Sequence, residues 1–322
     1  MPHARGDTEV VIVGGGPVGM LVTAELADFG IPAVVVESTP QTSDQPKAST
    51  IHARTVQSLV RRGYLPGLER AGESSPEPFH FASLPGLRIP VPPNEPRPPI
   101  LKRPQADLER EFEASAVDKG AVVLRGHRAT AIRQDPDSVE VTTEGPAGTR
   151  VLSGRYLVGA DGARSTVRRQ LGFATETSEA TVAAMMGLVR FPRPDAVPRG
   201  WQRTERGWTV ARVGADGRGL IRTLDCTRPH AHRERPLTLE ELSAEATRIA
   251  GHEIPMTDPV HLTRFSDYTR LVRSYRQGRA FLAGDAAHVH FPIGGQGLST
   301  GLLDALNLAW KLACTVRGTA GR

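Results

Sequence analysis

Aromatic residues make up only 5% of the 322-residue chain. Proteins that bind single-stranded nucleic acid stack bases on aromatic side chains, and this sequence offers few such platforms. The net charge of +5 gives no support to nucleic-acid binding either, because the basic residues are spread along the chain without a block of like charges. A nucleic-acid-binding protein gathers its basic residues on one face or element, so no nucleic-acid partner is expected.

Cysteine is also scarce. The two cysteines, Cys226 and Cys314, lie far apart and fit neither a CxxC redox motif nor a zinc-binding spacing. Two isolated thiols are typical of a protein from a reducing compartment, which favours the cytoplasm. We expect no metal site.

Long apolar runs are missing as well. No segment approaches the roughly 20 apolar residues of a membrane span. The apolar stretch from Val10 to Leu26 follows Asp7 and Glu9, where a signal peptide would need basic residues, and glycines interrupt it. We therefore expect no membrane association. The hydrophobic content of 39% is ordinary for a globular protein with a well-developed core.

The N-terminal segment has the pattern of a β–α–β unit. Residues 9–13 (EVVIV) form a β-branched apolar run, typical of a strand buried on both faces. Helical periodicity follows and ends at Gly30, and a second apolar run over residues 33–36 ends on Glu37. This succession predicts a parallel sheet.

A G-x-G-x-x-G motif, Gly14, Gly16 and Gly19, joins the first strand to the helix. We expect Gly14 to permit a tight turn, Gly16 to let a pyrophosphate approach the backbone, and Gly19 to let helix and strand pack closely. The helix N-terminus, opened by Pro17 and Val18, offers unpaired N–H groups to phosphates. The motif predicts a dinucleotide site.

An acidic residue completes this pattern. Glu37 ends the second strand, where a carboxylate binds the adenosine ribose in dinucleotide-binding folds, and Ser38 follows it. The strand, the glycine turn, the helix and the acid stand in the order and at the spacing that such a site requires.

The rest of the chain alternates between helical and strand patterns. Ten prolines between residues 76 and 104 exclude a helix or a central strand there. A helix is predicted over residues 105–117 and a final helix over 298–316, with strands near 122–124, 139–143, 155–158 and 279–283. From residue 181 to about 228 the pattern is β-rich, with Asp216-Gly217 as a hairpin turn. Thr238 and Glu241 predict a helix start, and Gly251 its end.

Two distant segments identify the nucleotide. Residues 156–171 (YLVGADGARSTVRRQL) and 278–311 (GRAFLAGDAAHVHFPIGGQGLSTGLLDALNLAWK) resemble the DG and GD fingerprints of FAD-dependent aromatic hydroxylases. These are the para-hydroxybenzoate hydroxylase-like, or group A, flavoprotein monooxygenases. The resemblance covers essentially the whole chain in motif order, and it is strongest to bacterial hydroxylases that modify aromatic polyketides and rifamycin-type antibiotics.

The resemblance implies an α/β fold, with a discontinuous Rossmann-like FAD-binding domain and an inserted β-rich substrate domain. We assign the FAD-binding domain to residues 1–75, 104–180 and 276–322, and the inserted domain to 181–275. A Pro-rich excursion on the substrate side covers residues 76–103. The inserted domain is expected to form one wall of the substrate cavity.

The resemblance also implies contacts with FAD. Asp161 and Gly162 of the DG motif are associated with the pyrophosphate and with NAD(P)H, and Asp285, after Gly284, with the ribityl chain. The resemblance also implies that the backbone of one segment lies close to the isoalloxazine ring. The residues concerned are Pro292, Gly295, Gly297, Leu298 and Ser299. Many relatives have Met-Asn where this chain has Leu298-Ser299, which leaves hydrogen bonding to the pyrimidine edge of the flavin open.

Four further positions match cofactor contacts of the family. Arg54 lies in a H-A-R-T segment and is a candidate to bind a phosphate of FAD. Lys47 stands where relatives have an arginine, and a lysine cannot make the two parallel hydrogen bonds of a guanidinium group. Gln105 matches a glutamine that touches the ribityl chain, and Ala129 an adenine contact.

Several other side chains have open interpretations. Arg164 and Arg168 follow the DG motif. Their side chains either contact a ligand or are solvated charges on the surface. His288 and His290 are favoured as packing residues beside the GD turn over a metal or general-base role. Trp201 and Trp208 are expected in the core or cavity wall of the inserted domain.

The implied activity is that of an FAD-dependent monooxygenase. NADPH or NADH would reduce the flavin transiently, and O2 would form a C4a-hydroperoxide that hydroxylates a phenolic or polyketide-like substrate. A Baeyer–Villiger or epoxidising enzyme, or a truncated non-catalytic flavin-binding protein, remains an alternative. Members of the family continue beyond the last helix, so a homo-oligomer or a partner chain that completes the missing region is a further expectation.

Overall fold

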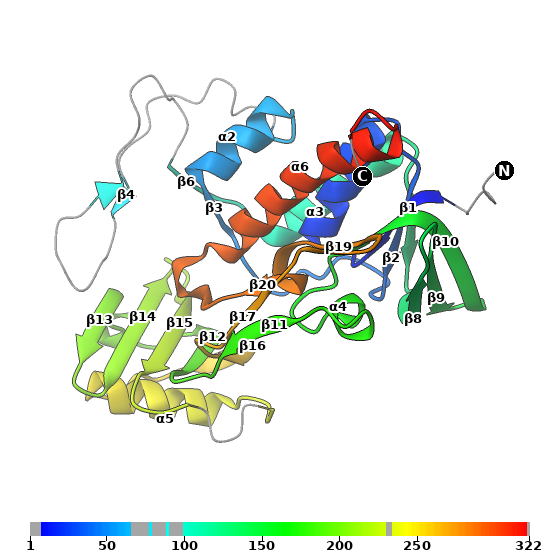
Figure 1. Ribbon diagram of the computed structural model, residues 1–322. Helices are drawn as coiled ribbons and strands as arrows, with labels where there is room; N and C mark the ends of the chain where they lie inside the picture. Colours follow the sequence, from blue (N-terminus) through cyan, green and yellow to red (C-terminus); the bar gives the residue numbers. More distant parts are fainter. Residues whose placement is uncertain (1–7, 66–76, 79–87, 90–98, 230–233, 321–322) are drawn as a thin grey trace. The chain divides into compact units, whose positions relative to one another are not determined.

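The computed structural model describes residues 8–65, 77–78, 88–89, 99–229 and 234–320 (Figure 1). The chain divides into two compact units. Unit 1 consists of residues 1–176 and 270–322, and unit 2 of residues 177–269. Unit 2 begins and ends a few residues before the inserted domain assigned from the sequence. Most of the Pro-rich excursion lies outside the described residues.

Unit 1 is built on a large sheet with the strand order β18-β19-β10-β1-β2-β7. Its central neighbours, from β19 to β7, run parallel, as the β–α–β pattern predicts. β9 pairs antiparallel with β10, and β8 with β9. The bounds are β1 (Thr8–Val13), β2 (Ala33–Glu37), β7 (Val122–Arg125), β8 (Arg128–Gln134), β9 (Val139–Gly145), β10 (Gly148–Gly159), β18 (Arg276–Gln277) and β19 (Ala280–Leu282).

Three helices cover one face of this sheet: α1 (Pro17–Asp28), α3 (Gln105–Asp118) and α6 (Gly297–Val316) (Figure 1). Alternate residues of a strand point to opposite faces, so Val10 and Ile12 of β1 pack against these helices. Val11 and Val13 pack on the opposite face, in a second core that includes the β8–β9 ribbon. Burial on both faces explains the unbroken apolar run of β1.

Short elements complete unit 1. β3 (Thr50–His52) pairs antiparallel with β6 (Ile100–Lys102) and leads directly into α2 (Ala53–Arg61). The other short elements are β4 (Glu77–Pro78), β5 (Arg88–Ile89), α4 (Thr166–Gln170), η2 (Gly284–Ala286), β20 (His288–Val289) and η3 (Pro292–Gly294). The chain leaves unit 1 through β11 (Thr175–Ser178) and returns through β17 (Thr269–Val272).

Unit 2 is an antiparallel sheet in the order β13-β14-β15-β12-β16, with α5 on one face. The predicted hairpin is confirmed: β14 and β15 pair antiparallel, and Gly217 between them has a φ of +75°. The bounds are β12 (Ala183–Arg190), η1 (Pro194–Ala196), β13 (Gly200–Thr204), β14 (Gly207–Val213), β15 (Arg218–Asp225), α5 (Leu239–Ala250) and β16 (Thr257–Phe265).

The predicted ends of α5 are also confirmed. The Thr238 hydroxyl accepts a hydrogen bond from the Glu241 N–H at 3.2 Å, and Gly251 ends the helix with a φ of +80°. The Glu241 carboxylate pairs with Arg264 of β16, which ties the first turn of α5 to the edge strand. No helix among the described residues has the length and apolar character needed to cross a membrane.

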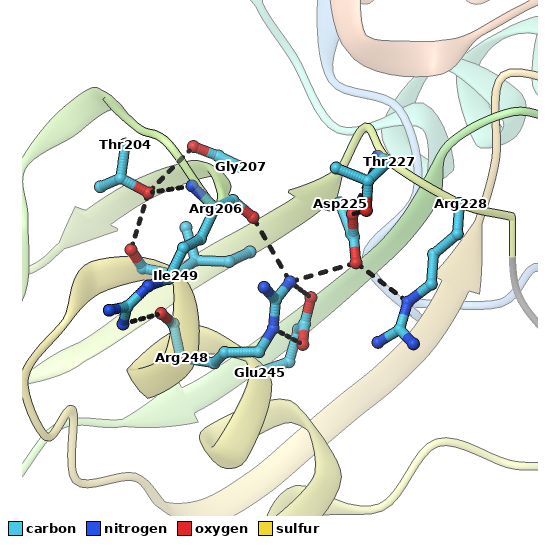
Figure 2. Close-up of polar contacts among 9 residues, drawn as sticks. All are labelled: Thr204, Arg206, Gly207, Asp225, Thr227, Arg228, Glu245, Arg248 and Ile249. Atoms are coloured by element: carbon cyan, nitrogen blue, oxygen red, sulfur yellow. Dashed lines mark hydrogen bonds and ion pairs between the residues drawn. The ribbon is translucent and has the colours of Figure 1, made fainter.

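A buried carboxylate anchors the other end of α5 (Figure 2). Asp225, at the end of β15, accepts hydrogen bonds from the Thr227 N–H at 2.9 Å and from Arg248 of α5 at 3.1 Å. Arg248 also pairs with Glu245 at 2.7 Å. Burial opposes ionisation of Asp225, but the hydrogen bonds from Thr227 and the charge of Arg248 outweigh it and lower its pKa.

The substitution Asp225→Asn is expected to destabilise unit 2 by about 2 kcal/mol, because it removes a buried charge-assisted network. A carboxyl whose pKa is lowered by folding stabilises the protein above its ordinary pKa and loses that effect as the pH falls. The stability gap between wild type and variant should therefore narrow in acid. Urea unfolding followed by tryptophan fluorescence measures it. Asp195→Asn, which removes an exposed charge from the same unit, is the control; an equal loss in both variants would contradict the role given to Asp225.

Candidate functional site

Three strand ends meet at one edge of the unit 1 sheet. β1, β10 and β19 are parallel neighbours, so the loops that follow them lie on the same side. The Ala160 N–H donates to the Val13 carbonyl at 2.8 Å, and the Ala283 N–H donates to the Gly159 carbonyl at 3.0 Å. The glycine motif, the DG motif and the GD motif are thereby brought together from distant parts of the sequence.

The glycine turn is packed so closely that side chains are excluded. Gly14 has a φ of +105°, and a Cβ atom there would lie 2.4 Å from the Ala160 carbonyl oxygen. A Cβ on Gly19 would lie 1.9 Å from the Gly14 carbonyl oxygen. Both glycines are therefore required by the packing of α1 against the strand ends, as expected from the motif.

Gly16 differs from its neighbours. A Cβ added to Gly16 would meet no atom within 4 Å, and its φ of −72° suits any residue. Neither packing nor backbone conformation of the protein requires glycine here. Gly16 also precedes the first turn of α1, which no side chain caps. The absent side chain leaves room beside the free N–H groups of a helix N-terminus, where an anionic group binds.

Glu37 faces this turn. Its carboxylate accepts hydrogen bonds from the Gly15 N–H at 2.7 Å and from the Thr39 N–H at 2.7 Å, while the Ser38 hydroxyl lies 3.3 Å away. Burial raises the pKa of Glu37, but the hydrogen bonds from Thr39 and Gly15 outweigh it, so the net shift is downward. The side chain is held as a carboxylate at the end of β2.

Asp161 lies where β10 ends. Its Oδ2 atom accepts from the N–H groups of Thr166 at 2.6 Å and Val167 at 3.2 Å, at the start of α4. Its Oδ1 atom is buried and has no hydrogen-bond partner among the described residues. Burial raises the pKa of Asp161 more than these hydrogen bonds lower it. Gly162 follows with a φ of +77° and open space around it.

Arg168 joins two of the motifs. It is only 5% exposed, and its guanidinium donates to the carbonyls of Ala163 and Ala286, each at 2.8 Å. The surface-charge interpretation is therefore wrong for Arg168, which fixes the DG loop to the GD turn. Arg164 is exposed.

The GD turn is anchored to α6 through one carboxylate. Asp304 accepts from the Gly284 N–H at 2.9 Å and pairs with His288 Nε2 at 2.6 Å. Desolvation lowers the pKa of His288, but Asp304 raises it more, and the net shift is upward. His288 is 8% exposed and packs beside the turn, with the His290 ring centroid 6.3 Å away. The described residues hold no His, Cys, Asp or Glu cluster suited to a metal ion.

Asp285 has a different environment. Its side chain is exposed, yet surrounding protein atoms raise its pKa by desolvation, against the opposing effect of His288 and His290. It follows Gly284, whose φ is +60°. The carboxylate is thus available to a ligand at the strand edge.

The N-termini of α1 and α6 lie side by side at this edge. Val18 packs against both Gly284 and Gly301, where added Cβ atoms would lie 3.0 Å and 2.7 Å from its methyl groups. No side chain caps either helix. Two helix N-termini at one edge concentrate partial positive charge there.

Ser299 ties α6 to the segment before α2. Its hydroxyl accepts from the His52 N–H at 2.9 Å, and its carbonyl accepts from the Thr55 hydroxyl at 3.3 Å. Ser299 and Leu298 are 5% and 7% exposed. The Ser299 hydroxyl is thus used in a hydrogen bond within the protein. The sequence alone did not reveal this contact.

The other candidates occupy the surrounding elements. Gln105 opens α3, and its N–H donates to the Ala48 carbonyl at 3.0 Å. The side chains of three of them, Lys47, Arg54 and Pro292, are exposed. Ala129 lies at a bulge in β8. Gly297 is the first residue of α6, and Gly295 packs against Thr50. Their roles as cofactor contacts stay predictions.

Sequence reasoning missed Asp304. The signal was present, since a single carboxylate in the apolar helix segment 302–310 (LLDALNLAW) calls for a buried partner.

Comparison with known proteins identifies the group to which these motifs belong. The family described as "FAD binding domain" matches residues 7–322. The chain belongs to this family.

Its relatives include an uncharacterized aromatic compound monooxygenase of Bacillus subtilis strain 168, YhjG, at 37% identity over 97% of this chain and 62% of that protein. A dialkyldecalin synthase of Streptomyces rugosporus is 37% identical over 97% of this chain and 66% of that protein. The solved structure of an anhydrotetracycline hydroxylase of Streptomyces rimosus, OxyS, has a TM-score of 0.83 at 35% identity, over 98% of this chain and 63% of that one.

These findings confirm the resemblance to FAD-dependent aromatic hydroxylases and the predicted α/β fold class. This chain spans about two thirds or less of the length of these relatives.

The substitution Asp304→Asn is expected to destabilise the protein more at about pH 6 than at about pH 9. His288 has a raised pKa in the folded state, so its stabilising contribution is full below its ordinary pKa of 6.5 and is lost as the pH rises through the raised value. Thermal unfolding at the two pH values measures the difference. Asp118→Asn, an exposed acid at the end of α3, should show no such dependence. Equal losses at both pH values would refute the coupling of Asp304 to His288.

Proposed function

We propose that the chain binds FAD at the edge formed by β1, β10 and β19, as the FAD-binding part of a monooxygenase. The substrate would be a phenolic or polyketide-like aromatic compound, with NADPH or NADH as reductant and O2 as oxidant. The observation that carries the proposal is Gly16: its missing side chain serves no packing need of the protein, and it opens beside an uncapped helix N-terminus.

The residues at the edge fit the groups of FAD. The N–H groups of Gly16, Val18 and Gly19 suit the pyrophosphate, and the fixed carboxylate of Glu37, beside Ser38, suits the ribose hydroxyls. The exposed carboxylate of Asp285 suits the ribityl hydroxyls. Asp161 offers a buried oxygen without a partner among the described residues. We assign supporting contacts to Lys47, Arg54, Gln105 and Ala129.

FAD held at this edge would supply the activation of O2 for transfer to an aromatic ring, with NAD(P)H as its reductant. The chain supplies position and electrostatics. The N-terminus of α6, from Gly297 to Ser299, directs the positive end of its dipole at the site, which favours the negative charge of a reduced ring. Arg168 and Asp304 hold the DG and GD loops in one arrangement.

A second candidate function has specific support. One relative is a dialkyldecalin synthase, named for a product and not for an oxygenation. The second candidate is that this chain binds FAD and takes part in a reaction that is not an oxygenation.

One experiment separates these functions. The as-isolated protein should show flavin absorbance, and aromatic polyketides should stimulate NADPH oxidation, with one atom of labelled O2 found in the product. Flavin absorbance with neither NADPH oxidation nor label incorporation would favour the second candidate. A protein that takes up no FAD would overturn both.

The substitution Gly16→Val is expected to weaken FAD binding at least about tenfold while leaving the stability of the apoprotein unchanged. The Cβ atom of the new side chain meets no protein atom within 4 Å, and the side chain occupies the space assigned to the pyrophosphate. Gly19→Ala should instead lower the stability of the apoprotein itself, because its Cβ would meet the Gly14 carbonyl. FAD titration and thermal unfolding of both variants give the comparison. Normal FAD affinity in Gly16→Val would rule out the proposed pyrophosphate position.

A further inference from the structure

The two-stranded ribbon of β3 and β6 has two unlike faces. Ile51 and Leu101 stand opposite each other in its register, and both pack against the core that α1 and α6 share. Side chains alternate along a strand, so the neighbouring pair, Thr50 and Lys102, lies on the other face. This second face is here called the outer face of the ribbon.

The outer face adjoins the glycine-rich segment before α6. A Cβ atom added to Gly295 would lie 3.2 Å from the Thr50 Cβ atom and 3.3 Å from its hydroxyl oxygen. Thr50 therefore packs against this segment, which leads within two residues into the N-terminus of α6 at Gly297. Figure 1 shows β3 beside α6, in keeping with the hydrogen bond between His52 and Ser299.

Lys102 brings a positive charge to the outer face. Its Nζ atom donates a hydrogen bond to the Thr50 hydroxyl at 2.7 Å, so the ammonium group is held one side chain away from Gly295. A hydroxyl is neutral, and this bond fixes the ammonium group without neutralising it. The side chain of Lys102 is exposed and hence accessible to a ligand.

A second polar group of the ribbon points to a ligand as well. His52 follows Ile51 in β3, so it lies on the same face as Thr50. Its Nε2 atom is buried and makes no hydrogen bond with any residue that the structure describes. A buried ring nitrogen without a partner is costly, which favours a bound group on this side of the ribbon.

We infer that the outer face of the ribbon lies against bound FAD and that Lys102 stabilises the negative charge of the reduced isoalloxazine ring. Uptake of a hydride makes the neutral ring anionic. The N-terminus of α6 offers this charge only the partial charges of its N–H groups, whereas Lys102 offers a full charge from a second element. The inference rests on the proposed function and adds to it a residue that sets the reduction potential of the cofactor.

The reduction potential of the bound flavin tests this inference. Lys102→Met keeps the length of the side chain and removes its charge. The affinity for reduced FAD relative to oxidised FAD should fall about tenfold in this variant, a modest change because an exposed charge is partly screened. For a two-electron couple this lowers the midpoint potential by about 30 mV. Spectroelectrochemical titration of the FAD-loaded protein measures it.

Two further variants serve as controls. Lys102→Arg, which keeps the charge, should stay close to the wild-type potential. Lys119→Met removes the same charge from another exposed position of unit 1 and should also leave the potential unchanged. Lys119 pairs with Asp28 at the far end of α3, about 20 Å along the helix from Gln105.

A wild-type potential in Lys102→Met would overturn the inference, as would an equal shift in Lys119→Met. Loss of affinity for both redox forms by the same factor would also contradict it, since a contact that serves only packing or the phosphates leaves the potential unchanged. If Lys102→Met does not fold, Lys102→Gln, equally uncharged and more polar, takes its place with the same expectation.

Failure of this inference and failure of the proposed function have different signatures. A normal flavin spectrum with unchanged potential refutes the role of Lys102 and leaves the FAD site standing. A protein that takes up no FAD overturns both.

Discussion

The close approach of three stretches of backbone is the constraint on which the site depends. Gly14, Gly19 and Ala160 lie so near one another that a single added carbon atom at either glycine would overlap a carbonyl group. This approach places the start of α1 directly on the ends of β1 and β10. The free N–H groups of the helix therefore point at the same edge as the loops after β10 and β19, and an extended nucleotide can contact all of them.

Side-chain contacts then fix the surrounding loops without a ligand. Arg168 fastens the DG loop to the GD turn, Asp304 fastens that turn to α6, and Ser299 fastens α6 to the segment before α2. Each of these groups is buried or nearly so. Loops held in this way lose little conformational freedom on binding, which favours affinity. Gly16 and Asp285, in contrast, stay accessible to solvent.

Local patterns predicted much of this structure. The apolar run of β1, the glycine turn, Glu37 at the end of β2 and the Asp216-Gly217 hairpin all depend on neighbours in the sequence, and the structure confirms these elements. β3, α2 and β8 were not predicted, because they are short or polar and gain their stability from tertiary partners such as β6 and β9. The roles of Arg168 and Ser299 depend on contacts across more than a hundred residues, which one sequence cannot show.

The bond between His52 and Ser299 has a consequence for synthesis in the cell. The two residues are 247 positions apart, and a ribosome takes on the order of ten seconds or more to add that many. During this interval the nascent β–α–β unit lacks α6, so the apolar side of α1 that later receives Leu302 and Ala305 has no cover. The proposed nucleotide site, which includes the start of α6, is therefore complete only after the last helix has emerged, and until then the unfinished polypeptide exposes an apolar surface.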